Sequence, residues 1–101
     1  MKLLLLLSYD ITNDKGRTKM AKQLKQFGFE RLQYSVFAGQ CTAARWNNWK
    51  RALEKLFEKY KAPGDKFYIM PQSEKLFRQT EMNGEQFDMD WVTGKTQVVY
   101  I

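Results

Sequence analysis

Asp10 is the residue of this chain whose position best suits chemistry. It is the first acid after the apolar run Leu3–Leu7, which is too short to cross a bilayer and is typical of a strand buried on both faces. Its carboxylate would then lie at the C-terminal end of a strand, where sheet proteins often bind ligands and metal ions. Residues 10–14 are also good turn sequence, so a structural role for Asp10 stays open.

The residue types that the sequence lacks exclude several catalytic mechanisms. The chain has no histidine, which excludes a histidine general base, a histidine-ligated zinc and a histidine-dependent ribonuclease mechanism. Any catalysis must therefore use carboxylates, hydroxyls or a metal ion. Cys41 is the one cysteine, so no intramolecular disulfide can form and a cytoplasmic location is expected. Three further acids, Asp14, Asp88 and Asp90, lie in turn-like segments, where acids are usually solvated rather than metal-bound.

Positive charge is concentrated in the first two thirds of the chain. The 101 residues include 17 basic and 11 acidic ones, a net charge of +6. Residues 15–61 contain twelve basic and three acidic side chains, whereas residues 62–101 contain four basic and six acidic ones. Such a field, with aromatic residues interleaved, favours nucleic acid as the partner. A solvated basic helix face without a ligand is the alternative.

Apolar spacing predicts two helices. The first would be capped by Asp14 or Thr12 and would end at Gly28; its buried stripe is Met20, Leu24 and Phe27, and basic residues cover its other faces. The second would be capped by Thr42 and would end at Pro63-Gly64. Its core-facing residues are Trp46, Trp49, Leu53, Leu56 and Tyr60.

Two further segments read as strands. Residues 30–38 alternate, which predicts a strand, or a hairpin that turns around Gly39. The alternation places Arg31 and Phe37 on one face and Leu32 and Val36 on the other. Residues 66–70 predict a strand that Pro71 closes.

The order of these elements predicts a single ferredoxin-like α+β domain over residues 1–101, a βαββαβ sandwich with both helices on one face of an antiparallel sheet. The other sheet face would lack cover, so we expect a homodimer packed through the sheet faces. Residues 72–101 form a C-terminal extension that ends in the strand Val98–Ile101, which could pair within its own subunit or be exchanged. The N-terminal leucine run is too short, and its flank too poor in small residues, for a signal peptide, and no membrane association is expected.

The chain resembles a known family at several of these positions. Tyr9-Asp10-Ile11 after the leading strand, Arg17 in a basic first helix, Gly28, and the strand 33–39 (Gln-Tyr-Ser-Val-Phe-Ala-Gly) are similar to the small CRISPR-associated protein of the spacer-acquisition module, the dimeric partner of the CRISPR integrase. The likeness covers about the first seventy residues and is poor beyond Pro71.

The resemblance implies a homodimer and, in some members, a metal-dependent endonuclease acting on RNA or DNA. Asp10 from each subunit would face its symmetry mate across the twofold axis and hold one Mg²⁺ or Mn²⁺, the catalytic ion. The family's other functional positions fall on residues that would bind nucleic acid, Arg17, Lys19 and Arg31, and on residues that would shape a pocket, Tyr9 and Phe37. Lys19 replaces an arginine of some relatives, which exchanges a bidentate phosphate contact for a point charge.

Two functions of different class follow from the sequence. In the first, the protein bridges integrase subunits and binds double-stranded DNA during spacer acquisition in antiviral defence. In the second, it is an endonuclease that cleaves DNA or single-stranded RNA, and whether the chain is an enzyme stays open. We favour the first, since it requires only a basic surface and a partner-binding edge. A generic RNA-binding domain of this fold would need a Lys/Arg-Gly-aromatic spacing that the sequence does not contain.

Overall fold

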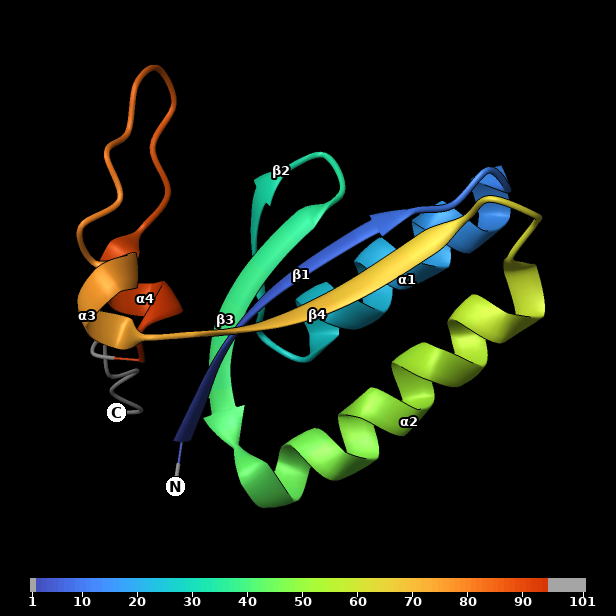
Figure 1. The fold of residues 1–101 in the computed structure, drawn as a ribbon, viewed down its shortest axis with the longest axis horizontal. Coiled ribbons are helices and arrows are strands. Elements are labelled where there is room, and N and C mark those ends of the chain that lie inside the picture. The colour runs from blue at the N-terminus through green and yellow to red at the C-terminus, as the bar shows by residue number, and fades with distance from the viewer. Residues whose placement is uncertain (1, 95–101) are drawn as a thin grey trace, which may run out of the picture.

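The fold is organised around β1 (Lys2–Asp10), which lies between two neighbouring strands (Figure 1). The computed structural model describes residues 2–94. β1 pairs antiparallel with β3 (Val36–Thr42) and with β4 (Lys66–Gln72), and β2 (Glu30–Gln33) extends the sheet beyond β3. The strand order is therefore β2-β3-β1-β4.

Two helices make the connections between these strands. α1 (Asp14–Gln26) joins β1 to β2, and α2 (Ala43–Tyr60) joins β3 to β4. Both pack on the same face of the sheet (Figure 1). The result is the predicted ferredoxin-like βαββαβ sandwich, which is confirmed. No helix within residues 2–94 is long and apolar enough to span a membrane.

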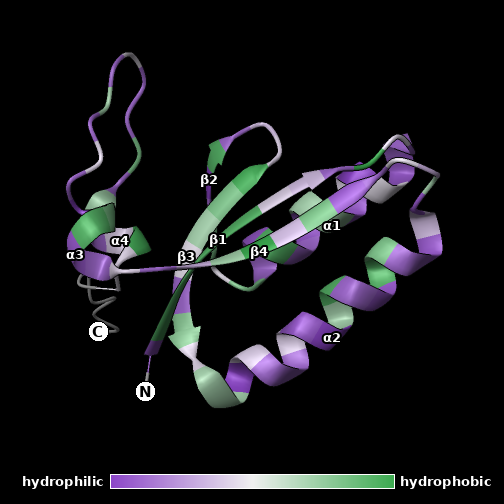
Figure 2. Cartoon of the chain, viewed as in Figure 1, coloured by the Kyte–Doolittle hydropathy of each residue, from purple (hydrophilic) through white to green (hydrophobic). Residues whose placement is uncertain are grey.

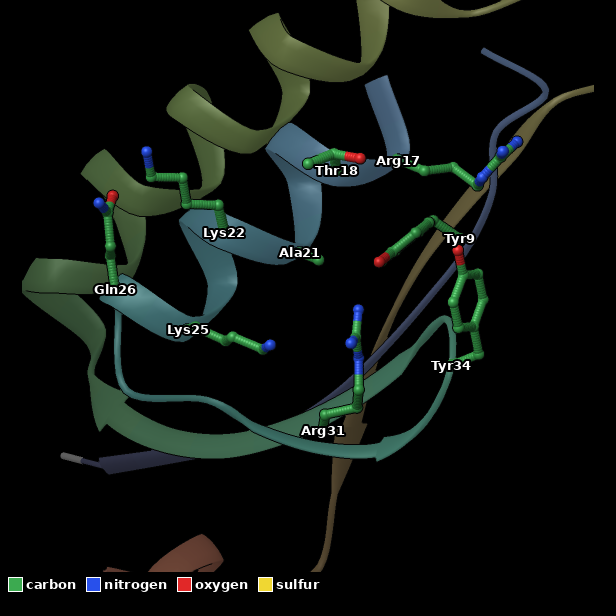
Figure 3. A pocket seen from close by; sticks show the side chains of 9 residues that line it. All are labelled: Tyr9, Arg17, Thr18, Ala21, Lys22, Lys25, Gln26, Arg31 and Tyr34. Carbon is green, nitrogen blue, oxygen red and sulfur yellow. The ribbon is translucent and has the colours of Figure 1, made fainter. Parts of the chain in front are cut away.

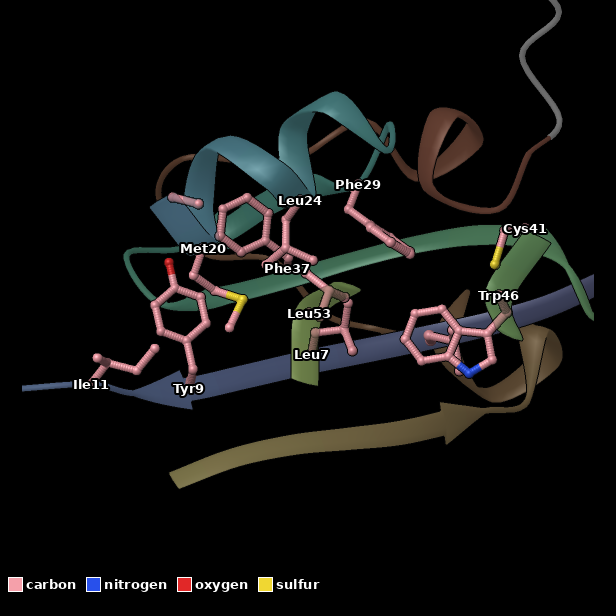
Figure 4. Packing of buried hydrophobic residues seen from close by; sticks show 12 residues of the cluster. Leu7, Tyr9, Ile11, Met20, Leu24, Phe29, Phe37, Cys41, Trp46 and Leu53 are labelled. Carbon is pink, nitrogen blue, oxygen red and sulfur yellow. The ribbon is translucent and has the colours of Figure 1, made fainter. Parts of the chain in front are cut away.

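The main core lies between the sheet and the two helices. Side chains alternate along β1, so Leu5, Leu7 and Tyr9 face the helices, and each is at most 4% exposed. Burial of one large apolar side chain stabilises the fold by about 1.5–3 kcal/mol. The predicted stripes of both helices join this core except at Tyr60: Met20, Leu24, Trp46 and Leu53 are buried in it (Figure 4), and Phe27, Trp49 and Leu56 pack against it.

Among residues 2–94, the opposite sheet face is covered at one end and open at the other, so the expectation that it lacks cover is half wrong. Phe77 from α3 (Glu74–Phe77) and Val92 from α4 (Met89–Val92) pack on Leu4 and Ala38. Both helices are too short for their apolar residues to repeat, which explains why the sequence did not predict them. The remaining end of this face exposes Tyr68, which is 54% accessible.

The cap of α1 differs from the prediction, whereas the cap of α2 agrees with it. Asn13, rather than Asp14 or Thr12, caps α1 by accepting a hydrogen bond from the Gly16 amide. The cap of α2 at Thr42 and the left-handed Gly28, with φ of 90°, are confirmed.

The β2–β3 hairpin turns at residues 34–35 and not at Gly39. Gly39 lies inside β3, where the Phe29 ring packs directly on its backbone. A Cβ at this position would come within 2.2 Å of that ring, which explains why the residue is glycine. β4 continues through Pro71 to Gln72. β4 is at the edge of the sheet that residues 2–94 form, and edge strands tolerate proline. The predicted strand Val98–Ile101 lies outside the described residues.

Asp65 ties the loop after β1 to the turn after α2. Its carboxylate accepts hydrogen bonds from the Ala62 amide at 2.8 Å and from the amide and hydroxyl groups of Thr12 at 3.2 and 2.7 Å. These hydrogen bonds lower the pKa of the Asp65 carboxyl group, and the bond from the Ala62 amide has the largest effect. The clamp therefore fixes the loop that carries the chain from Asp10 into α1.

We expect Asp65→Asn to lower the unfolding temperature at pH 7, because an amide nitrogen cannot accept these hydrogen bonds. The carboxyl pKa is lower in the folded than in the unfolded chain, where it is about 3.9. The stabilisation is therefore complete above the unfolded value and is lost as the pH falls through the folded value. Thermal unfolding measured at a series of pH values below 7 should show that the difference in unfolding temperature between wild type and variant becomes smaller as the pH falls.

Glu54→Gln, which changes an exposed carboxylate on α2, is the matched control and should leave the curve unchanged. Equal unfolding temperatures for wild type and Asp65→Asn at pH 7 would contradict the clamp.

Candidate nucleic-acid interface

A cavity of about 600 Å³ lies between α1 and the β2–β3 hairpin (Figure 3). Residues of α1 form one wall and hairpin residues the other, with Tyr9 of β1 between them. Helical spacing places positions 18, 21, 22 and 25 of α1 along this wall. The residues that line the cavity are Tyr9, Arg17, Thr18, Ala21, Lys22, Lys25, Gln26, Arg31 and Tyr34. This set contains four cationic side chains and no carboxylate.

Arg31 is the cation that the fold positions most tightly. It lies opposite Phe37 in the β2–β3 pairing, and a register shift follows it in β2. The guanidinium carbon lies 5.1 Å from the centroid of the Phe37 ring and 5.5 Å from that of Tyr34, within the range of cation–π attraction. Its Nε is buried and has no hydrogen-bond partner among the described residues. The two rings thus hold a charge that protein groups leave partly unsatisfied.

Tyr9 places a hydroxyl group beside Arg31. Its ring stacks on Phe37 with centroids 6.3 Å apart, and the hydroxyl points into the cavity (Figure 3). Burial raises the pKa of the Tyr9 phenol, although a hydrogen bond and the charge of Arg31 oppose this effect. Tyr9 is therefore protonated at neutral pH and can donate a hydrogen bond to a ligand.

Arg17 lines the same cavity, but its charge is already engaged. One terminal nitrogen donates to the carbonyl oxygens of Ile11 and Thr12, at 2.9 and 2.7 Å, and the other forms an ion pair with Asp14. The guanidinium group holds the β1–α1 loop in place. Loss of Arg17 would disturb this loop as well as any bound phosphate.

Lys22 and Lys25 are cavity residues that sequence reasoning missed as site residues. Both are exposed, and no salt bridge within residues 2–94 involves either one. Lys25 points toward Arg31, whereas Lys22 extends away along α1 in Figure 3. In the sequence, the two lysines could not be distinguished from the other basic residues of a solvated helix face. Lys22 follows Thr18 by four residues and Lys25 follows Ala21 by four residues, and this helical spacing is the signal that could have grouped them.

The other two predicted binding and pocket residues lie away from the cavity surface. Lys19 lies on another side of α1, with its Nζ 5.8 Å from the Tyr60 ring centroid. Burial raises the pKa of the Tyr60 phenol, but a hydrogen bond from Lys19 and nearby lysine charges lower it by more. Phe37 is fully buried, so its ring contacts the Arg31 guanidinium group but does not line the cavity.

Asp10 points to the opposite side of the sheet from Tyr9, because successive side chains of β1 alternate. Its carboxylate is exposed, and Lys66 lies directly across from it on β4. Within one described chain, no group of three or more His, Cys, Asp or Glu residues could hold a metal ion. An oxygen-preferring cation such as Mg²⁺ suits this carboxylate, but a second copy would have to supply another one.

The three other acids considered as ligands have structural partners. Asp14 pairs with Arg17, Asp88 caps α4 by accepting from the Trp91 amide at 3.1 Å, and Asp90 pairs with Arg78 at 2.6 Å. These three carboxylates are therefore engaged in a helix cap or an ion pair of the chain's own.

Solved structures share this fold. A hypothetical protein from Thermus thermophilus superposes with a TM-score of 0.67 and 30% identity, over 84% of this chain and 94% of that one. Streptococcus pyogenes Cas2, crystallised at pH 6.5, gives a TM-score of 0.65 and 25% identity, over 80% of this chain and 99% of that one.

Sequence relatives point the same way. A Thermus thermophilus protein named CRISPR-associated endoribonuclease Cas2 is 38% identical over 72 residues, 71% of this chain and 76% of its own length. A Synechocystis protein named CRISPR-associated endoribonuclease Cas2 3 is 33% identical over 82 residues, 81% of this chain and 85% of its own. The family described as CRISPR associated protein Cas2 matches residues 1–80. The chain therefore belongs to the CRISPR-associated Cas2 family.

Proposed function

We propose that this protein acts as a homodimer that binds double-stranded DNA and bridges subunits of the CRISPR integrase during spacer acquisition. The observation that carries the proposal is the charge of the helical layer. α1 contains five basic residues and one acidic residue, and α2 contains five basic and two acidic ones. Hydrophilic residues recur along both helices in Figure 2, whereas the first part of β1 is hydrophobic.

The α1 surface supports the DNA-binding part of this proposal more strongly than the α2 surface. Asp14, the one acid of α1, is neutralised by Arg17, so the exposed lysines of this helix act without a nearby acid of their own helix. On α2, Arg51 and Lys55 share a shallow surface hollow with Glu54 and Glu58. A positive field without paired acids attracts phosphates through counterion release, which is independent of base sequence.

The open end of the sheet supports the dimer. Tyr68 of β4 lies across from Ser8 of β1 and is 54% exposed, at the end of this sheet face that α3 and α4 do not cover. An exposed aromatic side chain on a sheet face is a usual component of a contact between identical subunits. In the sheet formed by residues 2–94, β4 is also an edge strand, whose outer backbone groups could accept a strand from a partner.

We expect duplex binding to be sequence-tolerant and steeply salt-dependent. The double variant Lys15→Gln/Lys19→Gln should flatten the slope of log affinity against log salt concentration by up to about two units per subunit, because each lysine lost removes about one phosphate contact. Fluorescence anisotropy of a labelled blunt duplex, titrated at several salt concentrations, measures this slope.

Lys66→Gln is the matched control, since this exposed lysine lies on the sheet at the opposite face from the helices. A slope that falls with Lys66→Gln and not with the α1 variant would place the DNA on the sheet side and contradict the proposal.

A second candidate function is metal-dependent cleavage of phosphodiester bonds. Two observations favour it: relatives that are 33–38% identical are named endoribonucleases, and Asp10 is exposed on the open sheet face. Asp10 of each subunit would hold a Mg²⁺ or Mn²⁺ shared across the twofold axis. When bound, such an ion would supply a water nucleophile and stabilise negative charge on a phosphate oxygen. Lys66, across from Asp10, would attract the phosphate but would weaken cation binding.

If the protein cleaves RNA or DNA, Asp10→Asn should abolish cleavage and leave the dimer intact, because asparagine keeps the shape but loses the charge that holds the cation. Cleavage of labelled single-stranded RNA and duplex DNA with added Mg²⁺ or Mn²⁺, together with sedimentation equilibrium, tests both parts. Cleavage by the purified Asp10→Asn protein at the wild-type rate would show that Asp10 does not carry the activity.

A further inference from the structure

We propose that Tyr60 and the three lysines around it, Lys15, Lys19 and Lys59, form a binding site for one backbone phosphate of duplex DNA. The neutral phenol donates a hydrogen bond to a phosphate oxygen, and the lysines supply the charge. Duplex affinity is therefore coupled to the protonation of Tyr60. The inference rests on the proposed binding of duplex DNA by the helical layer and names the group through which pH controls it.

The fold brings the start of α1 and the end of α2 together at one end of the molecule (Figure 1). Tyr60 is the last residue of α2, and it packs on Gly16 near the start of α1. A Cβ at position 16 would come within 2.6 Å of the Tyr60 Cβ, so this close approach requires glycine. Helix packing thus holds the Tyr60 side chain in place, and the side chain stays partly exposed.

Cationic groups from both helices surround the Tyr60 ring. The Nζ of Lys19 lies 5.8 Å from the ring centroid and that of Lys59 lies 5.4 Å from it, both within the range of cation–π attraction. Lys15 precedes Lys19 by four residues, so the two lie on the same side of α1. No salt bridge within residues 2–94 involves any of the three lysines. Their charges are therefore available to an anionic ligand.

The phenol and a bound phosphate would compete for these cations. Burial raises the pKa of the Tyr60 phenol, but a hydrogen bond from Lys19 and the charges of Lys19, Lys59 and Lys15 lower it by more. A phosphate in the site would oppose this lowering, because its negative charge favours the neutral phenol and its oxygen accepts the hydrogen bond. Phosphate binding and ionisation of Tyr60 therefore exclude each other.

The unpaired cations end at this junction. Lys61, the next cation along the chain, forms an ion pair with Glu58 at 3.0 Å, and Lys55 shares its surface hollow with Glu54 and Glu58. Lysine ammonium groups act as point charges, so they attract a phosphate without reading the bases beside it. A duplex presents its phosphates on the outside, and the site suits one of them.

The test measures binding of the labelled blunt duplex by fluorescence anisotropy. Tyr60→Phe keeps the ring and loses the hydroxyl group, and it should weaken binding about fivefold at pH 7, the effect of one lost hydrogen bond. Tyr68→Phe, which changes an exposed tyrosine on the sheet, is the matched control and should bind as wild type does. Circular dichroism of each variant checks that it folds.

The loss should also depend on pH. As the pH rises from 7 to about 9.5, wild type should lose affinity faster than Tyr60→Phe, because the phenolate repels the phosphate and phenylalanine cannot ionise. Both proteins contain the same lysines, so the difference between their pH profiles isolates Tyr60. NMR of ring-labelled tyrosine gives a second readout: duplex should shift the titration of Tyr60 to higher pH.

The lysines are tested by the salt dependence. Lys59→Gln should flatten the slope of log affinity against log salt concentration by about one unit per subunit, since it removes one phosphate contact. Lys55→Gln removes the same charge one turn earlier on α2, beside two acids, and should leave the slope unchanged.

Equal duplex affinity of wild type and folded Tyr60→Phe at pH 7 would overturn the proposal, and so would parallel pH profiles of the two proteins. A slope that falls with Lys55→Gln and not with Lys59→Gln would do the same. If Lys15→Gln/Lys19→Gln flattens the slope while Tyr60→Phe changes nothing, duplex binding by the helical layer stands and the Tyr60 site is wrong. A slope that falls only with Lys66→Gln contradicts the proposed function itself.

Discussion

The alternation of side chains along β1 is the constraint on which the rest of the structure depends. Leu5, Leu7 and Tyr9 are buried against the helices, and a shift of one position would turn this apolar set to the other face. The same alternation sends Tyr9 and Asp10 to opposite sides of the sheet. Within one chain, the cationic cavity and the exposed carboxylate are therefore two separate sites, and no single ligand group can contact both.

The helix-side site depends on how Arg31 is held. Arg31 is half-buried, and its buried Nε has no hydrogen-bond partner among residues 2–94, which costs free energy. Cation–π contacts with Phe37 and Tyr34 offset part of that cost. Phe37 is in turn fixed by Tyr9 and by the β1–β3 register, which pairs it with Leu7. A cation positioned by the core in this way needs little reorganisation to bind phosphate. Arg17 contributes differently, since its bonds to the β1–α1 loop support the wall of the cavity.

Much of the fold could be predicted from hydrophobic periodicity, which is strong in β1, α1 and α2. The hairpin turn was misplaced because Gly39 serves a close approach by Phe29, a tertiary contact that has no local signature. The helices α3 and α4 were missed because four residues contain no repeat. For the site, the family likeness brought together Tyr9, Arg17 and Arg31, which the structure also brings together. It could not show that Lys19 lies on another side of α1 or that Asp10 faces away, since both depend on the rotation of an element.

We propose that the helical layer of this Cas2-family protein binds DNA and that the biological role does not require the Asp10 face. Spacer acquisition in cells that carry the integrase tests it most directly, scored by new spacers in the CRISPR array with Asp10→Asn and with the charge reversal Lys15→Glu/Lys19→Glu. We predict that Asp10→Asn supports acquisition and that the charge reversal abolishes it at equal protein level. Loss of acquisition with Asp10→Asn, while its dimer and DNA affinity stay normal, would contradict the account and make the metal chemistry the function.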